Sequence, residues 1–286
     1  MTVVVADLGA TNARFAIITH GKMSDIYQFA CDDFKDPATM IQSFIQSYAT
    51  DTKYLLCGVP GPVIKDEVKW TNRPWKLNAK KIKSQLKLKD VVIMNDLQVQ
   101  GNAVAKLDKK DLLYLQGKPG AQGPKLLVNI GTGLGSCYIV DGIVHAAEYG
   151  QSMMWEGYLL EERISGPGFK KLHQKFTNGS LPISAVKIEQ QCLQGNRFAK
   201  RTYQLFYTDL ARALMNLALT IKATGGVYFC GGVLGERTLK QMKFQKMFIQ
   251  HPKMAPLLKS MPLIFIKKKD FAFLGLKTIA RKFGWS

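Results

Sequence analysis

The N-terminal residues place a glycine turn between two strands, and this arrangement restricts the fold more than any other feature of the chain. Val3–Ala6 is a short β-branched run typical of a buried strand, and Ala13–Ile18 is a second predicted strand. The segment Asp7–Asn12 joins them with turn-forming residues. A dinucleotide-binding fold or a P-loop would continue from its glycine turn into a helix. The sequence therefore predicts that the phosphate-binding element is a hairpin.

The same pattern occurs again near the middle of the chain. Leu126–Ile130 and Ser136–Val140 are predicted strands, and Gly131–Gly135 joins them with three glycines in five residues. Such turns let backbone N–H groups approach phosphate oxygens, because no Cβ stands in the way. An ordinary hairpin turn is the alternative for either element alone. Two of them, one opening each half of the chain, indicate the duplication of one nucleotide-binding element.

A third glycine pair, Gly231–Gly232, closes a predicted strand, where an adenine or ribose could lie close to the backbone. Its alternative is a tight turn from strand to helix. Beside the first turn, the Asp7 carboxylate suits a magnesium ion or its waters, because Mg²⁺ prefers oxygen ligands. The candidate phosphate- and nucleotide-binding residues are Asp7, Leu8, Gly9, Ala10, Thr11, Asn12, Gly131, Thr132, Gly133, Gly231 and Gly232.

The rest of the chain alternates between strand and helix patterns. Further strands are predicted at 54–59, 90–94, 227–230 and 263–266, and helices at 37–48, 78–86, 203–224, about 238–248 and 271–283. Ser165–Gly168 is expected to turn into a helix that begins near Phe169. The pattern predicts an α/β fold, and the length of 286 residues favours two lobes. We expect a small lobe at 1–108, joined by a C-terminal helix at 273–286, and a large lobe at 109–272.

Two groups of polar residues are candidates for contact with a substrate. Asn95 and Asp96 follow a hydrophobic strand, at the end where open α/β sheets bind ligands. A carboxylate there could take the proton of a substrate hydroxyl as a phosphoryl group arrives; its alternative role is to cap the next helix. Glu148 and Glu162 flank a segment rich in Met and aromatics, the mixture that a sugar site needs. Solvated glutamates are the alternative. The Met and aromatic residues of that segment are Met153, Met154, Trp155 and Tyr158.

The composition restricts the partners and the compartment. The net charge is +19, yet only eight of the 40 basic residues are Arg, the side chain best suited to reading base edges. The lysine clusters are dispersed, so we expect no nucleic acid partner. The five cysteines are scattered, without metal-ligand spacing, which predicts reduced and mostly buried thiols. Neither a membrane-spanning run nor a signal peptide is visible, so a cytoplasmic protein is expected.

Together these motifs resemble the bacterial glucokinase family, within the hexokinase–actin-like superfamily. The matching pieces stand in the family's order at Asp7–Arg14, Thr71–Trp75, Asn95–Leu97, Gly131–Gly135, Glu162–Gly168 and Gly226–Gly232. The resemblance implies a two-lobed actin-like ATPase (ribonuclease H-like) fold with mixed sheets. It implies transfer of the ATP γ-phosphoryl group to glucose with Mg²⁺, giving glucose 6-phosphate and ADP, and homodimers. It also implies that Asp96 is the general base, that Asn95, Glu148 and Glu162 hold sugar hydroxyls, and that both hairpins bind phosphates.

The chain departs from the family pattern mainly on the sugar side. Glu148-Tyr149-Gly150-Gln151 stands where the family usually has Glu-Gly-Gly-His, and a helical segment that normally follows is largely missing. Gln151 can still donate to and accept from a hydroxyl, but it cannot titrate as imidazole does. Ala10 replaces the second glycine of the first turn. These changes leave a second hypothesis open, a sugar-binding regulator or degenerate kinase of the same fold without turnover.

Overall fold

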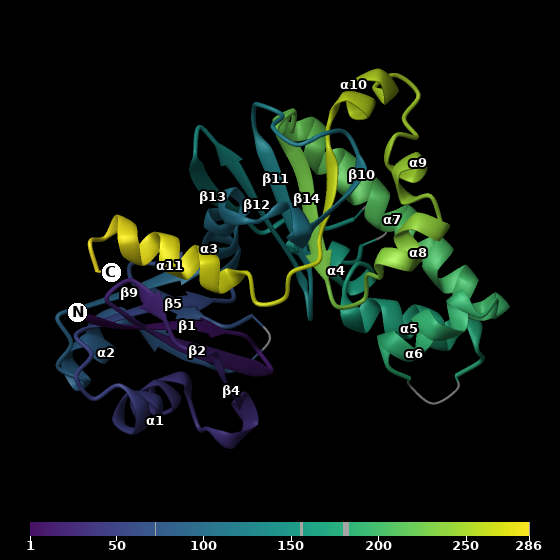
Figure 1. Ribbon diagram of the computed structural model, residues 1–286. Helices are drawn as coiled ribbons and strands as arrows, with labels where there is room; N and C mark the ends of the chain where they lie inside the picture. The colour runs from purple at the N-terminus through teal and green to yellow at the C-terminus, as the bar shows by residue number, and fades with distance from the viewer. Residues whose placement is uncertain (72, 155–156, 180–182, 286) are drawn as a thin grey trace. The chain divides into compact units, whose positions relative to one another are not determined.

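The computed structural model describes residues 1–71, 73–154, 157–179 and 183–285. Its contacts divide the chain into two units, each with its own sheet and core (Figure 1). Unit 1 comprises Met1–Leu107 together with Lys269–Ser286, and unit 2 comprises Asp108–Lys268. The C-terminal segment thus returns to the unit in which the chain begins.

The main sheet of unit 1 has the order β3-β2-β1-β5-β9, with β4 paired to β2. Strands β1, β5 and β9 are parallel, whereas β2 runs antiparallel to β1 and forms the first hairpin. The strands are β1 (Thr2–Leu8), β2 (Asn12–Thr19), β3 (Lys22–Met23), β4 (Tyr27–Ala30), β5 (Tyr54–Val59) and β9 (Asp90–Asn95). A small antiparallel sheet contains β6 (Val63–Ile64), β7 (Glu67–Lys69) and β8 (Lys76–Asn78).

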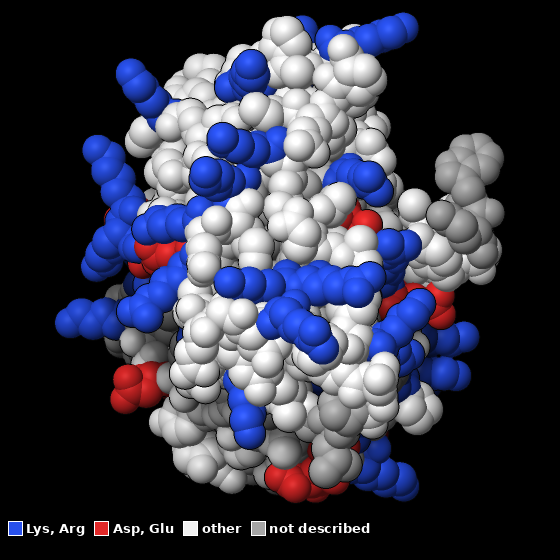
Figure 2. Space-filling model, turned by 90° about the vertical axis from the view of Figure 1, so that its right-hand side faces the viewer, with Lys and Arg blue, Asp and Glu red and all other residues white. Residues whose placement is uncertain are grey.

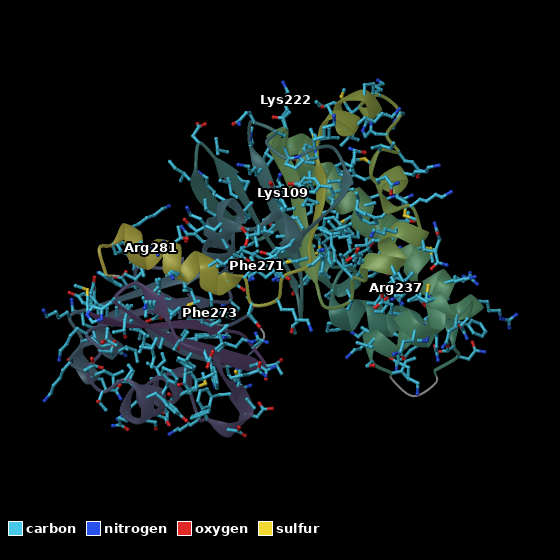
Figure 3. The ribbon with its side chains drawn as sticks, in the orientation of Figure 1. Lys109, Lys222, Arg237, Phe271, Phe273 and Arg281 are labelled. Carbon is cyan, nitrogen blue, oxygen red and sulfur yellow. The ribbon has the colours of Figure 1, made fainter. Side chains whose placement is uncertain are left out.

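Alternation along β1 gives this sheet two buried faces. Val4 packs in the cluster that contains Phe44 of α1, whereas Val5 packs in the cluster of α3 and α11. Phe273 of α11 belongs to the second cluster and lies on the side of its helix toward the sheet (Figure 3). The helices are η1 (Cys31–Asp33), α1 (Pro37–Tyr48), α2 (Ala79–Gln85), α3 (Asp96–Ala103), η2 (Val104–Lys106) and α11 (Ala272–Lys282).

Unit 2 repeats the hairpin within a sheet of order β10-β15-β14-β11-β12-β13. Strands β11, β14 and β15 are parallel, and β12 runs antiparallel to β11. The strands are β10 (Leu112–Gln116), β11 (Lys125–Ile130), β12 (Leu134–Val140), β13 (Ile143–Ala147), β14 (Gly226–Gly231) and β15 (Leu263–Ile266). The core of this unit contains the apolar face of α7, including Phe206 and Leu210, and the sheet residues Val128 and Phe229.

The helices of unit 2 are mostly short, apart from α7. They are η3 (Lys109–Asp111), η4 (Tyr149–Gln151), α4 (Leu160–Arg163), α5 (Gly166–Phe176), α6 (Ala185–Leu193), α7 (Arg197–Ile221), α8 (Glu236–Gln241), α9 (Phe244–Phe248) and α10 (Ala255–Ser260). The mixed α/β class and the predicted buried state of all five cysteines are confirmed.

Three helix predictions were wrong in their bounds. The single helix at 238–248 is two helices, because Lys243 adopts a left-handed φ of 52°. Leu239 and Phe244 would lie about 140° apart on one continuous helix, and the break lets both enter the core. Helix α5 begins at Gly166, ahead of Phe169, because the Ser165 side chain caps it. Helix α7 begins at Arg197, where the Asn196 side chain accepts from two backbone N–H groups.

Candidate functional site

The first glycine turn is closed by a hydrogen bond in which Gly9 N donates to Asn12 O at 3.0 Å. A Cβ at position 9 would stand 2.8 Å from that carbonyl oxygen, so only glycine fits. Ala10, where the family usually has a second glycine, is tolerated one residue later. The predicted turn between two strands is confirmed, with Asp7 opposite Arg14 and Leu8 opposite Ala13 in the ladder.

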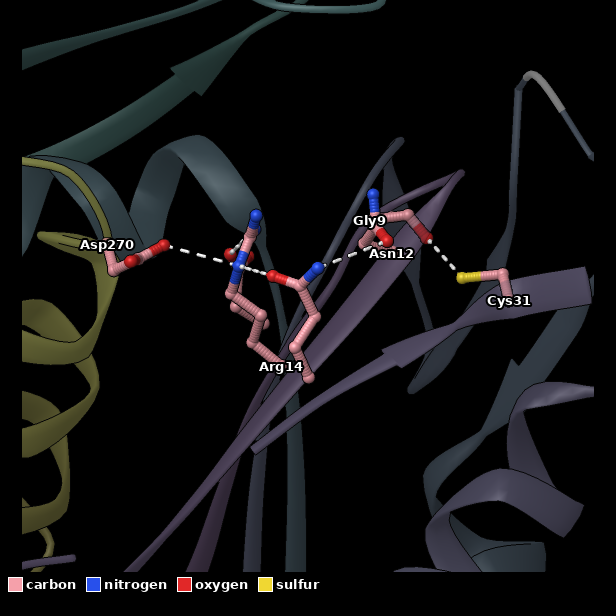
Figure 4. Close-up of polar contacts among 7 residues, drawn as sticks. Gly9, Asn12, Arg14, Cys31 and Asp270 are labelled. Carbon is pink, nitrogen blue, oxygen red and sulfur yellow. Dashed lines mark hydrogen bonds and ion pairs between the residues drawn. The ribbon is translucent and has the colours of Figure 1, made fainter. Parts of the chain in front are cut away.

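The carbonyl oxygens of this turn accept hydrogen bonds from Arg73 and Cys31. Ala10 O accepts from Arg73 Nη1 at 3.2 Å, and Thr11 O accepts from Cys31 N at 2.9 Å. Cys31 Sγ also donates to Gly9 O at 3.5 Å (Figure 4). Within the described part of the chain, the backbone N–H groups of Ala10 and Thr11 make no hydrogen bond. The turn therefore offers donors to an anion.

Asp7 stands near the end of β1 in a charged cluster with Arg14 and Asp270, and Figure 4 shows the latter two. Arg14 Nη1 lies 3.8 Å from the Asp7 carboxylate, and Arg14 Nε lies 3.2 Å from Asp270 Oδ1. Arg14 Nε also donates to Gln28 Oε1 at 3.1 Å. Burial raises the pKa of Asp7 from 3.8 to about 6, Arg14 opposes this rise, and Asp270 adds to it. Asp7 is thus a half-buried carboxylate that holds its proton unusually well.

Asn95 and Asp96 join β9 to α3, and Asn95 rather than Asp96 is the N-cap. The Asn95 Oδ1 atom accepts from the N–H groups of Leu97 and Gln98, and its Nδ2 donates to Gly61 O at 3.1 Å. Asp96 is the first helical residue, and its Oδ1 accepts from Leu97 N at 2.9 Å. A carboxylate in the first turn of a helix is stabilised by the helix dipole.

The parallel strands bring the polar groups of unit 1 to one edge of the sheet. Asp7 pairs with Gly58 of β5, and Val59 pairs with Asn95 of β9. Since neighbouring strands lie about 4.8 Å apart, Asp7 and the Asn95–Asp96 pair are about 10 Å apart along this edge. The Thr71–Trp75 motif contributes Arg73, which supports the first turn, whereas its Asn72 lies outside the described residues.

The second glycine turn adjoins the glycine pair of β14. Gly131 N donates to Gly133 O at 3.0 Å, and Gly131 O accepts from Gly166 N at 2.8 Å. Ile130 pairs with Gly231, where a Cβ would collide with the Ile130 carbonyl. The structure therefore brings Gly131–Gly133 and Gly231–Gly232 together at one edge of the unit 2 sheet.

The Glu148–Gln151 segment lies against the start of β12. Gly150 is buried, and a Cβ there would collide with the Leu134 carbonyl oxygen, which explains why this second glycine of the family motif is present. Tyr149, at the position of the other glycine, is half-buried and lies close to Asn216 of α7. Partial burial raises the pKa of Glu148, and the neighbouring Glu161 raises it further.

Glu161, which the sequence reasoning did not select, lies near enough to Glu148 to raise its pKa, whereas Glu162 bonds within its own helix. Glu161 Oε2 accepts from Leu134 N at 3.3 Å, beside the second glycine turn. Glu162 Oε2 accepts from Leu159 N at 2.9 Å and so closes the N-terminus of α4. No local pattern in the sequence separates Glu161 from Glu162, because both stand in the first turn of the same short helix.

The structure adds two findings on metals and membranes and one on surface charge. Among the described residues, no three His, Cys, Asp or Glu side chains are grouped to hold a metal ion, and no helix there combines the length and apolar character needed to span a bilayer. Figure 2 shows lysine and arginine side chains spread over the visible surface. Lys109, Lys222 and Arg237 likewise lie far apart on unit 2 (Figure 3).

Comparison with known proteins agrees with this geometry. The glucokinase family model matches residues 4–157 and 153–283. A glucokinase of Neisseria meningitidis serogroup C is 30% identical over 273 residues, which cover 84% of this chain and 82% of the relative. The chain belongs to the glucokinase family. Membership places it among the ATP-dependent hexose kinases and confirms the resemblance found in the sequence.

Solved structures show the same fold. The crystal structure of a glucokinase from an Antarctic psychrotroph has a TM-score of 0.79 at 22% identity, covering 98% of this chain and 99% of that one. A ROK family glucokinase from Streptomyces griseus, solved with glucose and AMPPNP, has a TM-score of 0.73 at 16% identity, covering 99% of this chain and 100% of that one. The two-lobed actin-like fold predicted from the glucokinase resemblance is confirmed.

Proposed function

We propose that this chain transfers the γ-phosphoryl group of ATP to the 6-hydroxyl of glucose, giving glucose 6-phosphate and ADP. The observation that carries the proposal is the position of Asp96, in the first turn of α3 at the sheet edge that also bears the Asp7–Asn12 turn. A phosphate-binding turn and a base at one edge are the two parts that phosphoryl transfer to an alcohol requires.

Asp96 is the proposed general base. Its Oδ1 is held by Leu97 N, which fixes the carboxylate relative to the helix. The carboxylate would hydrogen-bond the sugar hydroxyl and take its proton as the oxygen attacks the phosphorus. The Asn95 amide would fix the backbone between β9 and α3, because it caps α3 and donates to the Gly61 carbonyl. We propose that Asn95 also forms a hydrogen bond with a sugar hydroxyl.

The two glycine turns are the proposed phosphate sites. The N–H groups of Ala10 and Thr11 face no partner among the described residues, so they would donate to phosphate oxygens. Asp7 offers oxygen ligands beside them, a donor set that fits Mg²⁺ held largely through water and nucleotide oxygens. Bound there, Mg²⁺ would neutralise charge that develops on the phosphates. Gly231–Gly232 would let the adenosine lie against the backbone.

Glu148, Gln151 and Glu161 are the proposed sugar-binding side chains of unit 2. Two carboxylates can accept hydrogen bonds from several hydroxyls at once, and these bonds would offset the burial and the charge of Glu161, which together raise the Glu148 pKa. Glu162 was the residue expected from the family motif. We propose Glu161 for this role, because its charge acts on Glu148, whereas the Glu162 carboxylate caps its own helix at Leu159 N.

A coupled assay of ADP release with a panel of hexoses, ATP and magnesium tests the proposal. Glucose should support the fastest turnover. Asp96→Asn should lower kcat roughly 100- to 10,000-fold, because it removes the base. The melting temperature should change little, because the substituted side chain keeps the oxygen that accepts from Leu97 N. Asp90→Asn, at the other end of the same strand, is the control and should retain turnover. Unchanged turnover in Asp96→Asn would contradict the assignment of the base.

A sugar-binding regulator or degenerate kinase is the second candidate, favoured by Tyr149 and Gln151 where the family usually has Gly and His. Calorimetry with glucose and with ATP separates the two candidates. Binding of both ligands by a wild-type protein that releases no ADP with any hexose would favour the regulator. Sugar-dependent release of ADP would exclude it.

A further inference from the structure

A cavity of about 260 Å³ lies within unit 2, between the loop after Glu148, α4 and α7. Its volume corresponds to that of about nine water molecules, so it is sized for a small ligand. The lining side chains that matter are Tyr149, Tyr158, Arg163, Asp209, Arg212 and Asn216. None of them has a role in the phosphoryl transfer proposed above.

One wall of the cavity is a fixed guanidinium. Asp209 is 8% exposed, and its Oδ2 lies 2.6 Å from Arg163 Nε. Arg163 Nη1 donates to Tyr158 Oη at 3.0 Å, so the Arg163 fork is held from two sides. Burial lowers the pKa of Arg163, and its bonds to Tyr158 and Asp209 more than reverse this effect. The fork is therefore a preorganised cation.

A second guanidinium completes the charge pattern. Asp209, Arg212 and Asn216 occupy positions i, i+3 and i+7 of α7, on one face of the helix. Arg212 is exposed, and its side chain has no hydrogen bond or ion pair with any residue that the structure describes. Two guanidinium groups against one carboxylate leave the cavity with a net charge of about +1. A guanidinium fork matches the paired oxygens of a carboxylate or phosphate.

The cavity shares two walls with the proposed sugar-binding loop. Tyr149 lines the cavity, and the pKa of its neighbour Glu148 is raised by burial and by the charge of Glu161. Helix α4 likewise presents Arg163 to the cavity and Glu161 to Leu134 N. Tyr149 replaces the family's usual glycine, and the family segment that normally follows is largely missing here. One lining residue, Tyr149, is therefore a position at which this chain departs from its family.

We propose that this cavity binds a small metabolite through a carboxylate or phosphate group held by Arg163 and Arg212. The bound anion packs against Tyr149 and α4 and so adjusts the positions of Glu148 and Glu161. The effect on sugar affinity rests on the proposed function, whereas the binding itself does not. Anion binding measured without sugar or ATP therefore separates the two proposals.

Calorimetric titration of the full chain tests the site, with inorganic phosphate in one arm and succinate in the other at constant ionic strength. Succinamide, which is uncharged, is the matched probe. If only phosphate binds saturably, the ligand class is a phosphate ester. If only succinate binds saturably, the ligand class is a carboxylate. Absence of saturable binding of either anion, or equal binding of succinamide, would overturn the proposal.

Variants separate the cavity from the general positive charge of the surface. Arg212→Gln should weaken anion binding about tenfold or more, because it removes one charge-assisted contact. Arg212→Lys retains the charge without the fork and should lose less. Arg197→Gln removes an exposed arginine at the start of the same helix, outside the cavity lining, and should bind as wild type does. Equal weakening in Arg212→Gln and Arg197→Gln would show diffuse attraction to the surface and would overturn the site.

Discussion

At the scale of single residues, carboxylates of the same residue type have different environments. Asp7 is half-buried beside Arg14 and Asp270, and its pKa rises to about 6, whereas no comparable burial surrounds the exposed Asp25. Glu161 and Glu162 are adjacent in sequence but point about 100° apart around α4, because each helical residue advances the side chain by that angle. The role of each carboxylate therefore depends on the direction of its side chain as much as on its residue type.

The raised pKa of Asp7 predicts how stability depends on pH. Folded Asp7 keeps its proton to a higher pH than unfolded Asp7, so the free energy of unfolding should fall as the pH rises from about 4 to about 6. The loss is at most about 3 kcal/mol. Thermal denaturation across this range should show a smaller fall for Asp7→Asn than for wild type. Asp25→Asn should follow wild type; identical curves for all three proteins would refute the prediction.

The two glutamates of α4 should respond differently to the same substitution. Glu161→Gln should raise the KM for glucose about tenfold or more with little effect on melting, since it removes a charged acceptor from the sugar loop. Glu162→Gln should leave KM unchanged and lower stability by about 0.5–1 kcal/mol, because it weakens the bond from Leu159 N. Steady-state kinetics and calorimetric melting of both variants make the comparison. The reverse pattern would restore Glu162 as the sugar ligand.

At the scale of elements, the hairpins, the parallel strands and α1 followed from the sequence because burial imposes a readable period on each. The N-cap was harder to assign, since Asn95 and Asp96 are both residues that cap helices well. The break between α8 and α9 at Lys243 could not be predicted, because no glycine or proline marks it in the sequence. The rotation of α4 about its own axis decides which way Glu161 and Glu162 point. This rotation is set by packing, so the sequence alone does not reveal it. The cavity joins residues from 149 to 216, a proximity that no local pattern contains.

Gly150 allows the Glu148–Gln151 segment to approach β12, and its substitution should be costly. Gly150→Ala would place a methyl group against the Leu134 carbonyl oxygen, so the loop must shift. We expect a loss of about 1–3 kcal/mol in the free energy of unfolding. Gly232→Ala, where a Cβ meets nothing within 4 Å, is the control and should melt close to wild type. Equal melting temperatures for the two variants would argue against this close contact.

At the scale of the whole molecule, each unit has a separate core, and unit 1 is assembled from both ends of the chain. Helix α11 covers one face of the unit 1 sheet with Phe273, Leu276 and Ile279. Arg14 adds an ion pair from the first hairpin to Asp270, just ahead of that helix. The first glycine turn and the C-terminal segment therefore belong to one cooperative structure.

Substitution in α11 should destabilise unit 1 selectively. Phe273→Ala should cost about 3–5 kcal/mol, because Phe273 is only 1% exposed in the core. Hydrogen exchange should then show faster opening of β1 and β5, with protection in α7 unchanged. Phe283→Ala, at a 47% exposed position near the end of the same segment, is the control and should cost far less. Uniform loss of protection in both units would show that they unfold together.

The return of α11 to the N-terminal sheet has a consequence for the order of events during synthesis. A ribosome that has released residues 1–268 has delivered everything that unit 2 contains, but it still withholds Lys269–Ser286 from unit 1. The face of β1 that packs with Phe273 lacks this partner until the segment Lys269–Ser286 has been synthesised. Unit 1, whose synthesis begins first, is therefore completed only after all of unit 2 has been made, and Arg14 gains its Asp270 partner at that late stage.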